Sequence, residues 1–212
     1  MKKTIYIVRH GETDFNKQGI VQGGGVDSDL NDKGWQQAQS LFRYYRHIPF
    51  QAVLTSKLKR THQTMHPFIE EGIPWEQHAD INEMSWGIHE GKKGTEAMHQ
   101  EYREVVSAWN QGRYEAKVQD GESANDLGFR ISRFVRHLYH RPEETILVCS
   151  HGRAMCGLIC ALRDQPWSDI QQYKHHNTGL WLAHRHGETL RFTLENDVRH
   201  LEILKSLNTA NQ

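Results

Sequence analysis

Residues 4–13 read TIYIVRHGET, an apolar, β-branched run that stops abruptly at Arg9 and His10. A continuous apolar run of this length predicts a strand that is buried on both faces of a sheet. Residues 145–152 read TILVCSHG and repeat the arrangement, with His151 and Gly152 directly after the apolar run. The two segments therefore predict two buried strands that end in the same kind of polar residue.

The remainder of the chain alternates between helical and extended patterns. Apolar residues at three- and four-residue steps predict helices, and short β-branched runs predict strands. Residues 74–121 hold tryptophans and charges with weak periodicity, and predict a partly helical insertion. The other predicted elements, in chain order, are a helix over 31–45 with Asn31 as N-cap, a strand over 51–55, a helix from a Ser56 cap to near Gly72, helices over 123–140 and 153–163, and strands over 179–183 and 189–194 joined by a turn at 186–188.

This alternation of strands and helices predicts an α/β protein. We expect a three-layer sandwich with a mostly parallel central sheet and helices on both faces, formed as a single domain over residues 1–212. The insertion, roughly residues 74–121, is expected to be small, helical and placed over the functional site. In open parallel sheets, ligands bind beyond the carboxyl ends of the strands. If the two buried strands are neighbours, Arg9, His10 and His151 meet at that edge.

The charges of the chain are balanced, with 26 Lys+Arg, 26 Asp+Glu and a formal net charge of +0. This balance argues against a polybasic nucleic-acid-binding protein, because such binding depends on the number of phosphates neutralised. The apolar run over residues 5–8 is too short for the core of a signal peptide, and no stretch approaches the ~18 apolar residues of a membrane span. We therefore expect neither nucleic acid nor membrane as a partner, and a cytoplasmic location.

The cysteines at positions 149, 156 and 160 form an odd, clustered set, which is not typical of a disulfide framework. Cys156 and Cys160 are expected to be core residues of an apolar helix. Trp167 and Trp181 are expected to serve packing rather than ligand stacking. The polar tail over residues 206–212 is expected to fray.

The residues expected at the sheet edge suit an anion. The guanidinium groups of Arg9 and Arg60 offer planar forks of donors that match phosphate oxygens. The glycines after the two histidines let backbone N–H groups approach an anion closely. A neutral imidazole that faces a bound phosphoryl group can act as the nucleophile. The pattern therefore predicts phosphoryl chemistry by alignment and charge stabilisation, without a metal.

The motif over residues 9–13, together with Asn16 and Gln22-Gly23, resembles the signature of the histidine phosphatase superfamily, which includes cofactor-dependent phosphoglycerate mutases. The resemblance covers nearly the whole chain, because further motifs follow in the order that the family has. They read LNDKG at 30–34, SKLKRT at 56–61, INE at 81–83, GES at 121–123 and SHG at 150–152.

The resemblance implies a role for each site residue. His10 is implied as a nucleophile that forms a phosphohistidine, and Glu83 as a general acid that protonates the leaving oxygen. No metal and no cofactor are implied, and the implied partner is a small phosphate ester. The residues implied to bind substrate are Arg9, His10, Asn16, Gln22, Gly23, Arg60, Glu83, His151 and Gly152, of which Arg9, His10, Arg60, Glu83 and His151 are implied to be catalytic.

Two departures from the family pattern concern the rim of the pocket. The family usually has an arginine four residues after the asparagine, where this chain has Ile20. The glycine run over 23–25 is one residue longer than the usual spacing to Asp27. Both departures affect the identity of the substrate more than the reaction.

Hydrolysis is favoured over mutase chemistry. Residues 84–121 are short for a mutase lid and contain no paired arginines, and residues 86–91 resemble the phosphatase branch, which includes α-ribazole and sugar-phosphate phosphatases. A phosphoglycerate mutase and a non-catalytic phosphate-binding module are the alternatives, although a binding module has no need of Glu83. A homodimer is left open. The candidates for further substrate contacts are Lys92, Lys93, Arg103, Arg113 and Lys117.

Several other polar residues have simpler interpretations. Glu12 is expected to hold its loop through hydrogen bonds. His62 and His66 have a spacing that can bind a metal, but without an acidic or thiol partner they are expected on a solvated helix face. His175-His176 and residues 184–186 are interpreted as polar turns. The acids that compete with Glu83 for its role are Glu90, Glu96 and Glu101.

Overall fold

The computed structural model describes residues 2–202. The tail over 206–212, expected to fray, lies outside the described residues. Within residues 2–202, no helix combines the length and apolar character needed to cross a bilayer.

Six strands form one sheet, in the order β3-β2-β4-β1-β5-β6. The four strands β3, β2, β4 and β1 run parallel to one another, whereas β5 is antiparallel to both β1 and β6. The predicted mostly parallel sheet is therefore confirmed. The strands are β1 (Lys2–Arg9), β2 (Ala52–Thr55), β3 (Trp75–Gln77), β4 (Thr145–Ser150), β5 (Leu180–His186) and β6 (Thr189–Asp197).

The two strands that end in histidine are central neighbours in the sheet. In β1 and β4, Val8 pairs with Cys149 and Arg9 with Ser150, so both strands end at the same level. The backbone N–H of His10 then donates to Ser150 O at 3.0 Å. Both strands are buried because their apolar side chains contact helices on both faces of the sheet. This register brings the residues that follow the two strands together.

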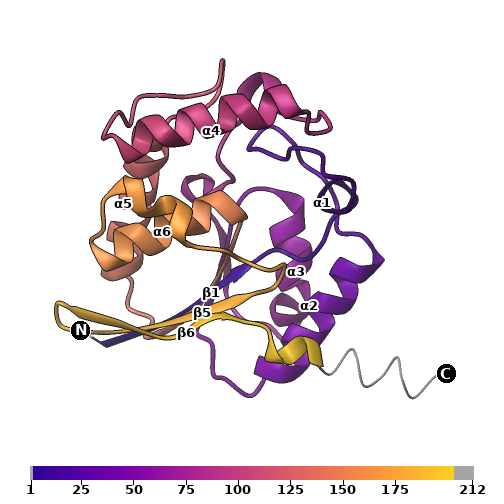
Figure 1. Ribbon diagram of the computed structural model, residues 1–212. Coiled ribbons are helices and arrows are strands. Elements are labelled where there is room, and N and C mark those ends of the chain that lie inside the picture. Colours follow the sequence, from indigo (N-terminus) through magenta and orange to yellow (C-terminus); the bar gives the residue numbers. More distant parts are fainter. Residues whose placement is uncertain (1, 203–212) are drawn as a thin grey trace.

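Helices cover both faces of the sheet, as the three-layer prediction requires (Figure 1). One core cluster joins the sheet to α5 and α6 and includes Trp109 of α4, and the other joins the sheet to α2 and α3. Figure 1 shows α4 beyond one end of the sheet, above α5 and α6. The helices are α1 (Asp14–Gln18), α2 (Asp32–Tyr45), α3 (Lys59–Glu70), α4 (Glu96–Asn110), α5 (Ala124–His140) and α6 (Gly152–Arg163), with 3₁₀ turns at Ala79–Ile81, Gly87–His89, Trp167–Gln172 and Arg199–Leu201.

Of the two N-caps predicted from the sequence, Asn31 and Ser56, the structure confirms the first. Asn31 caps α2, because its Oδ1 accepts from the backbone N–H of Gly34 at 2.9 Å. The predicted cap at Ser56 is wrong, since α3 begins at Lys59 with Leu58 in the N-cap position. The Ser56 hydroxyl is engaged elsewhere, within hydrogen-bonding distance of His151 and accepting from the backbone N–H of Leu58.

Two further predictions are corrected by the sheet. Residues 184–186 are not a polar turn, because they continue β5 and pair with both β1 and β6. The turn itself lies at Gly187, whose φ of 63° is the left-handed conformation that glycine adopts without cost. The predicted insertion over 74–121 includes strand β3, which extends the sheet beside β2. The rest of that segment forms α4 and two short 3₁₀ turns.

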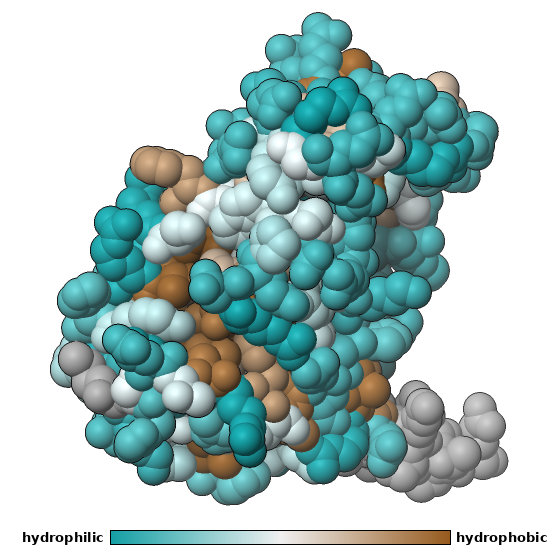
Figure 2. All heavy atoms as spheres, turned by 60° about the vertical axis from the view of Figure 1, so that its left-hand side comes forward, coloured by the Kyte–Doolittle hydropathy of each residue, from teal (hydrophilic) through white to brown (hydrophobic). Residues whose placement is uncertain are grey.

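The face that carries α5 and α6 has a hydrophobic band below a mostly hydrophilic upper part, where α4 lies (Figure 2). Tyr139, Leu190 and Phe192 are partly buried and pack against the core beneath this face. Phe129 of α5 is 73% exposed, and the Arg133 guanidinium lies 5.8 Å from its ring centroid.

Cys156 and Cys160 are buried free thiols in the core beneath this face, as predicted, and Trp181 packs there as well.

Candidate active site

The loop after β1 is held close to the helices beside it. The backbone N–H of Gly11 donates to Thr64 Oγ1 on α3 at 2.9 Å. A Cβ at position 11 would lie 2.7 Å from the carbonyl oxygen of Gly34, near the start of α2. Only glycine allows this approach, so the loop is clamped between two helices and the preceding side chain, His10, has a defined position.

His10 is buried with one ring nitrogen anchored. Its Nδ1 lies 2.7 Å from the carbonyl oxygen of Gly11, and a carbonyl can only accept. Nδ1 therefore carries the proton, and the neutral ring has its lone pair on Nε2. Burial, with the positive charges of Arg60 and Arg9, holds the pKa of His10 well below its usual value. The ring is a neutral base with an available Nε2.

His151 faces His10, with ring centroids 5.2 Å apart. Its Nδ1 accepts from Arg60 Nε at 3.1 Å, so the proton of the neutral ring is on Nε2, which lies 2.8 Å from Ser56 Oγ. Burial and the Arg60 charge also keep the pKa of His151 well below its usual value. His10 therefore carries its proton on Nδ1, whereas His151 carries its proton on Nε2. In each ring the hydrogen-bond partner of Nδ1 determines the position of the proton.

Two buried arginines surround these rings. Arg9 donates from Nη1 to the carbonyl oxygen of His175 at 2.7 Å, whereas its buried Nε has no hydrogen-bond partner among residues 2–202. Arg60 is fully buried and donates from Nη1 to Val26 O at 2.6 Å. Burial lowers the pKa of Arg60 to about 10, which still leaves it charged at neutral pH. A buried cationic donor without a partner is costly, so this cluster suits an anion.

Glu83 lies at the N-terminus of α6, beside the arginines. Its Oε1 accepts from the backbone N–H of Ala154 at 3.0 Å, and its Oε2 from that of Arg153 at 3.2 Å. A Cβ at Gly152 would lie 3.7 Å from both Arg9 Nε and Glu83 Oε2. The Glu83 carboxylate therefore occupies N–H groups at the start of α6, where the helix dipole favours negative charge, and the Arg9 guanidinium lies beside it.

The glycine loop, residues 23–25, is held by Glu90, whereas the Gln22 side chain contacts another residue. Glu90 Oε2 accepts from the backbone N–H of Gly25 at 2.8 Å, and a Cβ at Gly23 would lie 1.9 Å from Glu90 Oε1. The Gln22 side chain donates to Thr13 Oγ1 at 2.7 Å, so it braces its own loop. Among the acids that compete with Glu83, Glu90 therefore has a structural role.

Asn16 belongs to the same edge. It forms a capping box with Thr13 at the start of α1, and its Oδ1 accepts from Asn177 Nδ2 at 3.2 Å. Both interactions use its oxygen, which leaves the Nδ2 donors for a ligand. Glu12 holds the adjacent loop as predicted, because its carboxylate accepts from Asn31 Nδ2 at 3.1 Å and pairs with Lys33 Nζ at 2.6 Å.

A segment that sequence reasoning treated as a polar turn contributes to the site. The carbonyl of His175 accepts from Arg9, and its ring Nδ1 accepts from Trp181 Nε1 at 2.9 Å. Burial lowers the pKa of His175 to about 3. Asn177 Nδ2 donates to the carbonyl of His10 at 3.0 Å. The segment precedes β5, and the antiparallel pairing of β5 with β1 brings it to the edge where β1 ends.

Some of these groups line a cleft of about 250 Å³, whereas His10, Arg60, His151 and Asn16 are not among its lining residues. Arg9, Glu83 and Gly152 line it, together with Trp86 and Arg153. The basic residues predicted to contact the rest of the substrate do not line this cleft; all of them are exposed, and they are Lys92, Lys93, Arg103, Arg113 and Lys117. Arg153 is the basic side chain beside Arg9 that the cleft offers instead.

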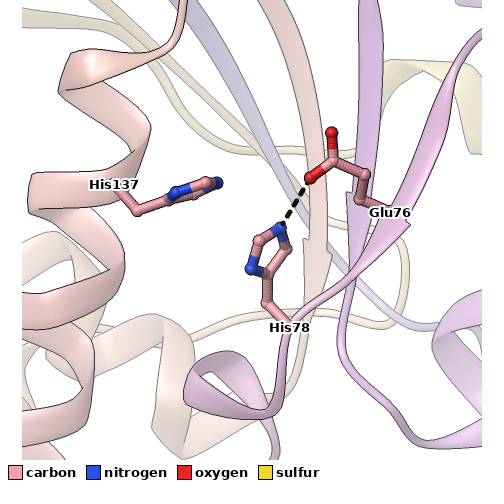
Figure 3. A group of neighbouring side chains, drawn as sticks. All are labelled: Glu76, His78 and His137. Atoms are coloured by element: carbon pink, nitrogen blue, oxygen red, sulfur yellow. Dashed lines mark ion pairs between the residues drawn. The ribbon is translucent and has the colours of Figure 1, made fainter.

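Histidine and carboxylate also meet at a second place, where β3 faces α5. Glu76, His78 and His137 have ligand atoms within 4.8 Å of one another (Figure 3). Arg141 donates to both oxygens of Glu76, at 2.7 and 2.8 Å, and its Nη1 lies 3.2 Å from His137 Nε2. A guanidinium thus already supplies the positive charge that this carboxylate needs, and the group is an ion-pair cluster.

The buried neutral histidines predict how stability depends on pH. Burial lowers the pKa of His175 to about 3 and that of His200 to about 4, whereas an unfolded histidine titrates near its ordinary value. Below about pH 6.5 the unfolded chain binds more protons, so the free energy of unfolding falls as the pH falls, by up to about 1.4 kcal/mol per pH unit for each such histidine.

Urea unfolding between pH 7.5 and 5 in phosphate-free buffer measures this slope. His200→Gln should reduce the slope, because it removes one of the buried histidines that cause it. A free energy of unfolding that stays constant over this range would contradict the expectation.

Known proteins share both the sequence pattern and the fold. The chain is 29% identical over 181 residues to the adenosylcobalamin/alpha-ribazole phosphatase of Salmonella typhimurium, covering 84% of this chain and 88% of the relative. It is 31% identical over 174 residues to 6-phosphofructo-2-kinase/fructose-2,6-bisphosphatase 1 of Rattus norvegicus, covering 81% of this chain but only 35% of that protein. The alpha-ribazole phosphatase of Shigella flexneri matches in structure with a TM-score of 0.80 and 25% identity, over 92% of this chain and 96% of that one.

These relatives carry phosphatase activity in their names, which agrees with a phosphomonoester hydrolase. The family described as histidine phosphatase superfamily (branch 1) matches residues 5–198, which include both buried strands and the histidine that follows each of them. The chain therefore belongs to the histidine phosphatase superfamily.

Proposed function

We propose that this protein is a metal-independent phosphatase that hydrolyses a small phosphorylated metabolite through a phosphohistidine on His10. The observation that carries the proposal is the state of the His10 ring. Its Nδ1–H is anchored to Gly11 O, its Nε2 is unprotonated, and the buried, unpartnered Nε of Arg9 belongs to the adjacent residue. A fixed neutral imidazole beside an unsatisfied cationic donor suits attack on a bound phosphoryl group.

In the proposed complex, the phosphoryl oxygens bind to the cationic cluster. Arg9 uses its unpartnered Nε, Arg60 approaches from α3, and His151 approaches from the end of β4. The Nδ2 group of Asn16 and the backbone at Gly23 and Gly152 complete the pocket. Burial, together with the guanidinium charges, lowers the pKa of both histidines, and a bound dianion offsets the part that comes from those charges.

The proposed reaction has two displacements at phosphorus. His10 Nε2 forms a bond to phosphorus while the bond to the leaving oxygen breaks, and Glu83, which this step requires in its protonated form, gives its proton to that oxygen. A water molecule then attacks the phosphohistidine, the P–N bond breaks, and the proton of the water passes to Glu83. Inorganic phosphate and the alcohol leave, and His10 and Glu83 return to their starting forms.

Hydrolysis, rather than transfer between two hydroxyls, is supported by the segment that contains α4. Residues 84–121 contain no paired arginines, and the basic side chains of α4 and its flanks lie away from the cleft. The named relatives are phosphatases or contain a phosphatase activity. A role in binding alone would leave no use for a carboxylate next to Arg9.

A panel of phosphate esters tests this function. Phosphoserine, phosphoglycerate, sugar phosphates and p-nitrophenyl phosphate are each incubated with the enzyme, and inorganic phosphate and isomer formation are measured together. We expect phosphate release without isomer formation, at the same rate with and without EDTA. Isomer formation that outpaces phosphate release would establish a mutase instead, loss of activity in EDTA a metal centre, and phosphate binding without turnover a binding module.

A further inference from the structure

A second cavity, of about 320 Å³, lies next to the cleft. It is formed between α4, the 3₁₀ turn Gly87–His89 and the loop at residues 21–22. Its volume is at the lower end of the range for small-molecule sites, about 300–1,000 Å³. Its lining includes Gln22, Trp86, His89, Met98, His99 and Tyr102.

The cavity and the cleft meet at Trp86, which packs against Tyr102 of the cavity. Trp86 lines both spaces, and its ring lies 5.5 Å from that of Tyr102 in an edge-to-face arrangement. The Tyr102 hydroxyl donates to Gln171 Oε1 at 2.8 Å, and the Arg153 guanidinium lies 5.7 Å from the Tyr102 ring centroid. Trp86 and the contact between Arg153 and Tyr102 therefore place the cavity directly beside the cleft.

Two of the polar side chains that line the cavity are already engaged in hydrogen bonds. His89 Nε2 lies 2.8 Å from Glu101 Oε2, and the Gln22 side chain is used by Thr13 and Ser28. The remaining lining consists of two aromatic rings, a thioether, an imidazole and two small or aliphatic residues, namely Trp86, Tyr102, Met98, His99, Val21 and Gly94. Aromatic rings and a methionine favour flat apolar partners, and offer little to a second negative charge.

We propose that this cavity binds the leaving group of the substrate, and that the leaving group is a planar, uncharged aromatic or heteroaromatic ring system. The proposal rests on the proposed phosphatase function and names its substrate class. A small, acid-bearing ester such as phosphoserine leaves the cavity unfilled and forfeits the burial of apolar surface there. The volume accommodates one or two fused rings.

Met98→Trp tests the proposal, because it fills the cavity from α4, and the lining of the cavity does not include Arg9, His10 or Arg60. 1-Naphthyl phosphate serves as the ring-bearing substrate and phosphoserine as the small one. Comparing variant with wild type for each substrate separately cancels their different intrinsic reactivity. We expect Met98→Trp to lower kcat/KM for 1-naphthyl phosphate by about 10- to 200-fold, mainly through KM, and to leave that for phosphoserine within about twofold.

The matched control is Glu104→Ala, an exposed position on the same helix, which should change neither substrate. Equal effects of Met98→Trp on both substrates, or none on 1-naphthyl phosphate, would overturn the proposal while leaving the phosphatase function in place. Thermal unfolding of the variant shows whether an equal loss reflects unfolding. If the variant is unfolded, inhibition of the wild-type enzyme by 1-naphthol tests the proposal instead. A cavity that binds rings must bind this alcohol, so 1-naphthol must inhibit competitively. Phosphate release from neither ester would instead count against the proposed function itself.

Discussion

Replacing His10 with alanine should lower kcat by about 10⁴- to 10⁶-fold, because losing the nucleophile of a covalent mechanism removes the whole chemical route. The ring has no equivalent nearby. The closest imidazole, His151, has its Nδ1 engaged with Arg60 and its Nε2 with Ser56. Folding should persist, because the backbone N–H of residue 10 retains its bond to Ser150 O whatever the side chain. Steady-state phosphate release and urea unfolding measure the two effects.

The same variant tests the intermediate directly. Wild-type enzyme mixed with a ³²P-labelled ester and quenched in alkali should retain label on the protein, because a phosphohistidine survives alkali better than acid. His10→Ala should retain none, whereas His66→Ala, an exposed histidine on α3, should behave as wild type in labelling and in turnover. Label on the His10→Ala protein would assign the nucleophile to another residue.

Glu83→Gln should slow esters with poor leaving groups by about 10²- to 10⁴-fold, the usual contribution of a general acid. p-Nitrophenyl phosphate should lose far less, since its leaving group needs little protonation. The amide is the same shape as the carboxylate but cannot donate the required proton. One of its ends must present an N–H to a backbone donor, such as the N–H of Arg153, which removes one hydrogen bond. We expect a stability cost of about 1–3 kcal/mol.

The comparison of kcat values for alkyl esters and p-nitrophenyl phosphate measures this difference. Glu96→Gln is the matched control, because Glu96 is an exposed acid on α4 that pairs with Arg103 away from the cleft. Equal losses on both types of ester for Glu83→Gln would show that the acid is another residue. If Glu83→Gln loses activity only because it unfolds, urea unfolding of the same sample will show the loss of stability.

Local sequence patterns were sufficient for the central elements. The apolar runs before Arg9 and before His151 have no polar face to expose to water. Each strand must therefore be covered on both faces of the sheet, which favours a central position for both strands. The Asn31 cap was recognisable because its hydrogen bond is made within its own helix turn. Ser56 was misassigned because its hydroxyl binds a residue 95 positions away, which local reasoning cannot anticipate.

Edge elements were harder to predict. Strand β3 has three exposed residues and no apolar alternation, so it becomes a strand only because β2 offers it a row of backbone partners. The histidines at 184 and 186 look like turn residues, yet they lie within β5, because that strand pairs with β1 on one side and β6 on the other. In both cases, long-range pairing prevails over a weak local preference.

By itself, the sequence placed Arg9, His10 and His151 at the carboxyl ends of two buried strands, where they meet if the strands are neighbours. The pairing of β1 with β4 in the structure meets that condition. Only the tertiary structure decided the protonation pattern and the supports. His175 and Asn177 reach the loop after β1 from more than 160 positions away, and leave no periodic or motif signal. The physical reason is that burial and hydrogen-bond partners set the state of an imidazole, and both come from segments that only the folded chain brings together.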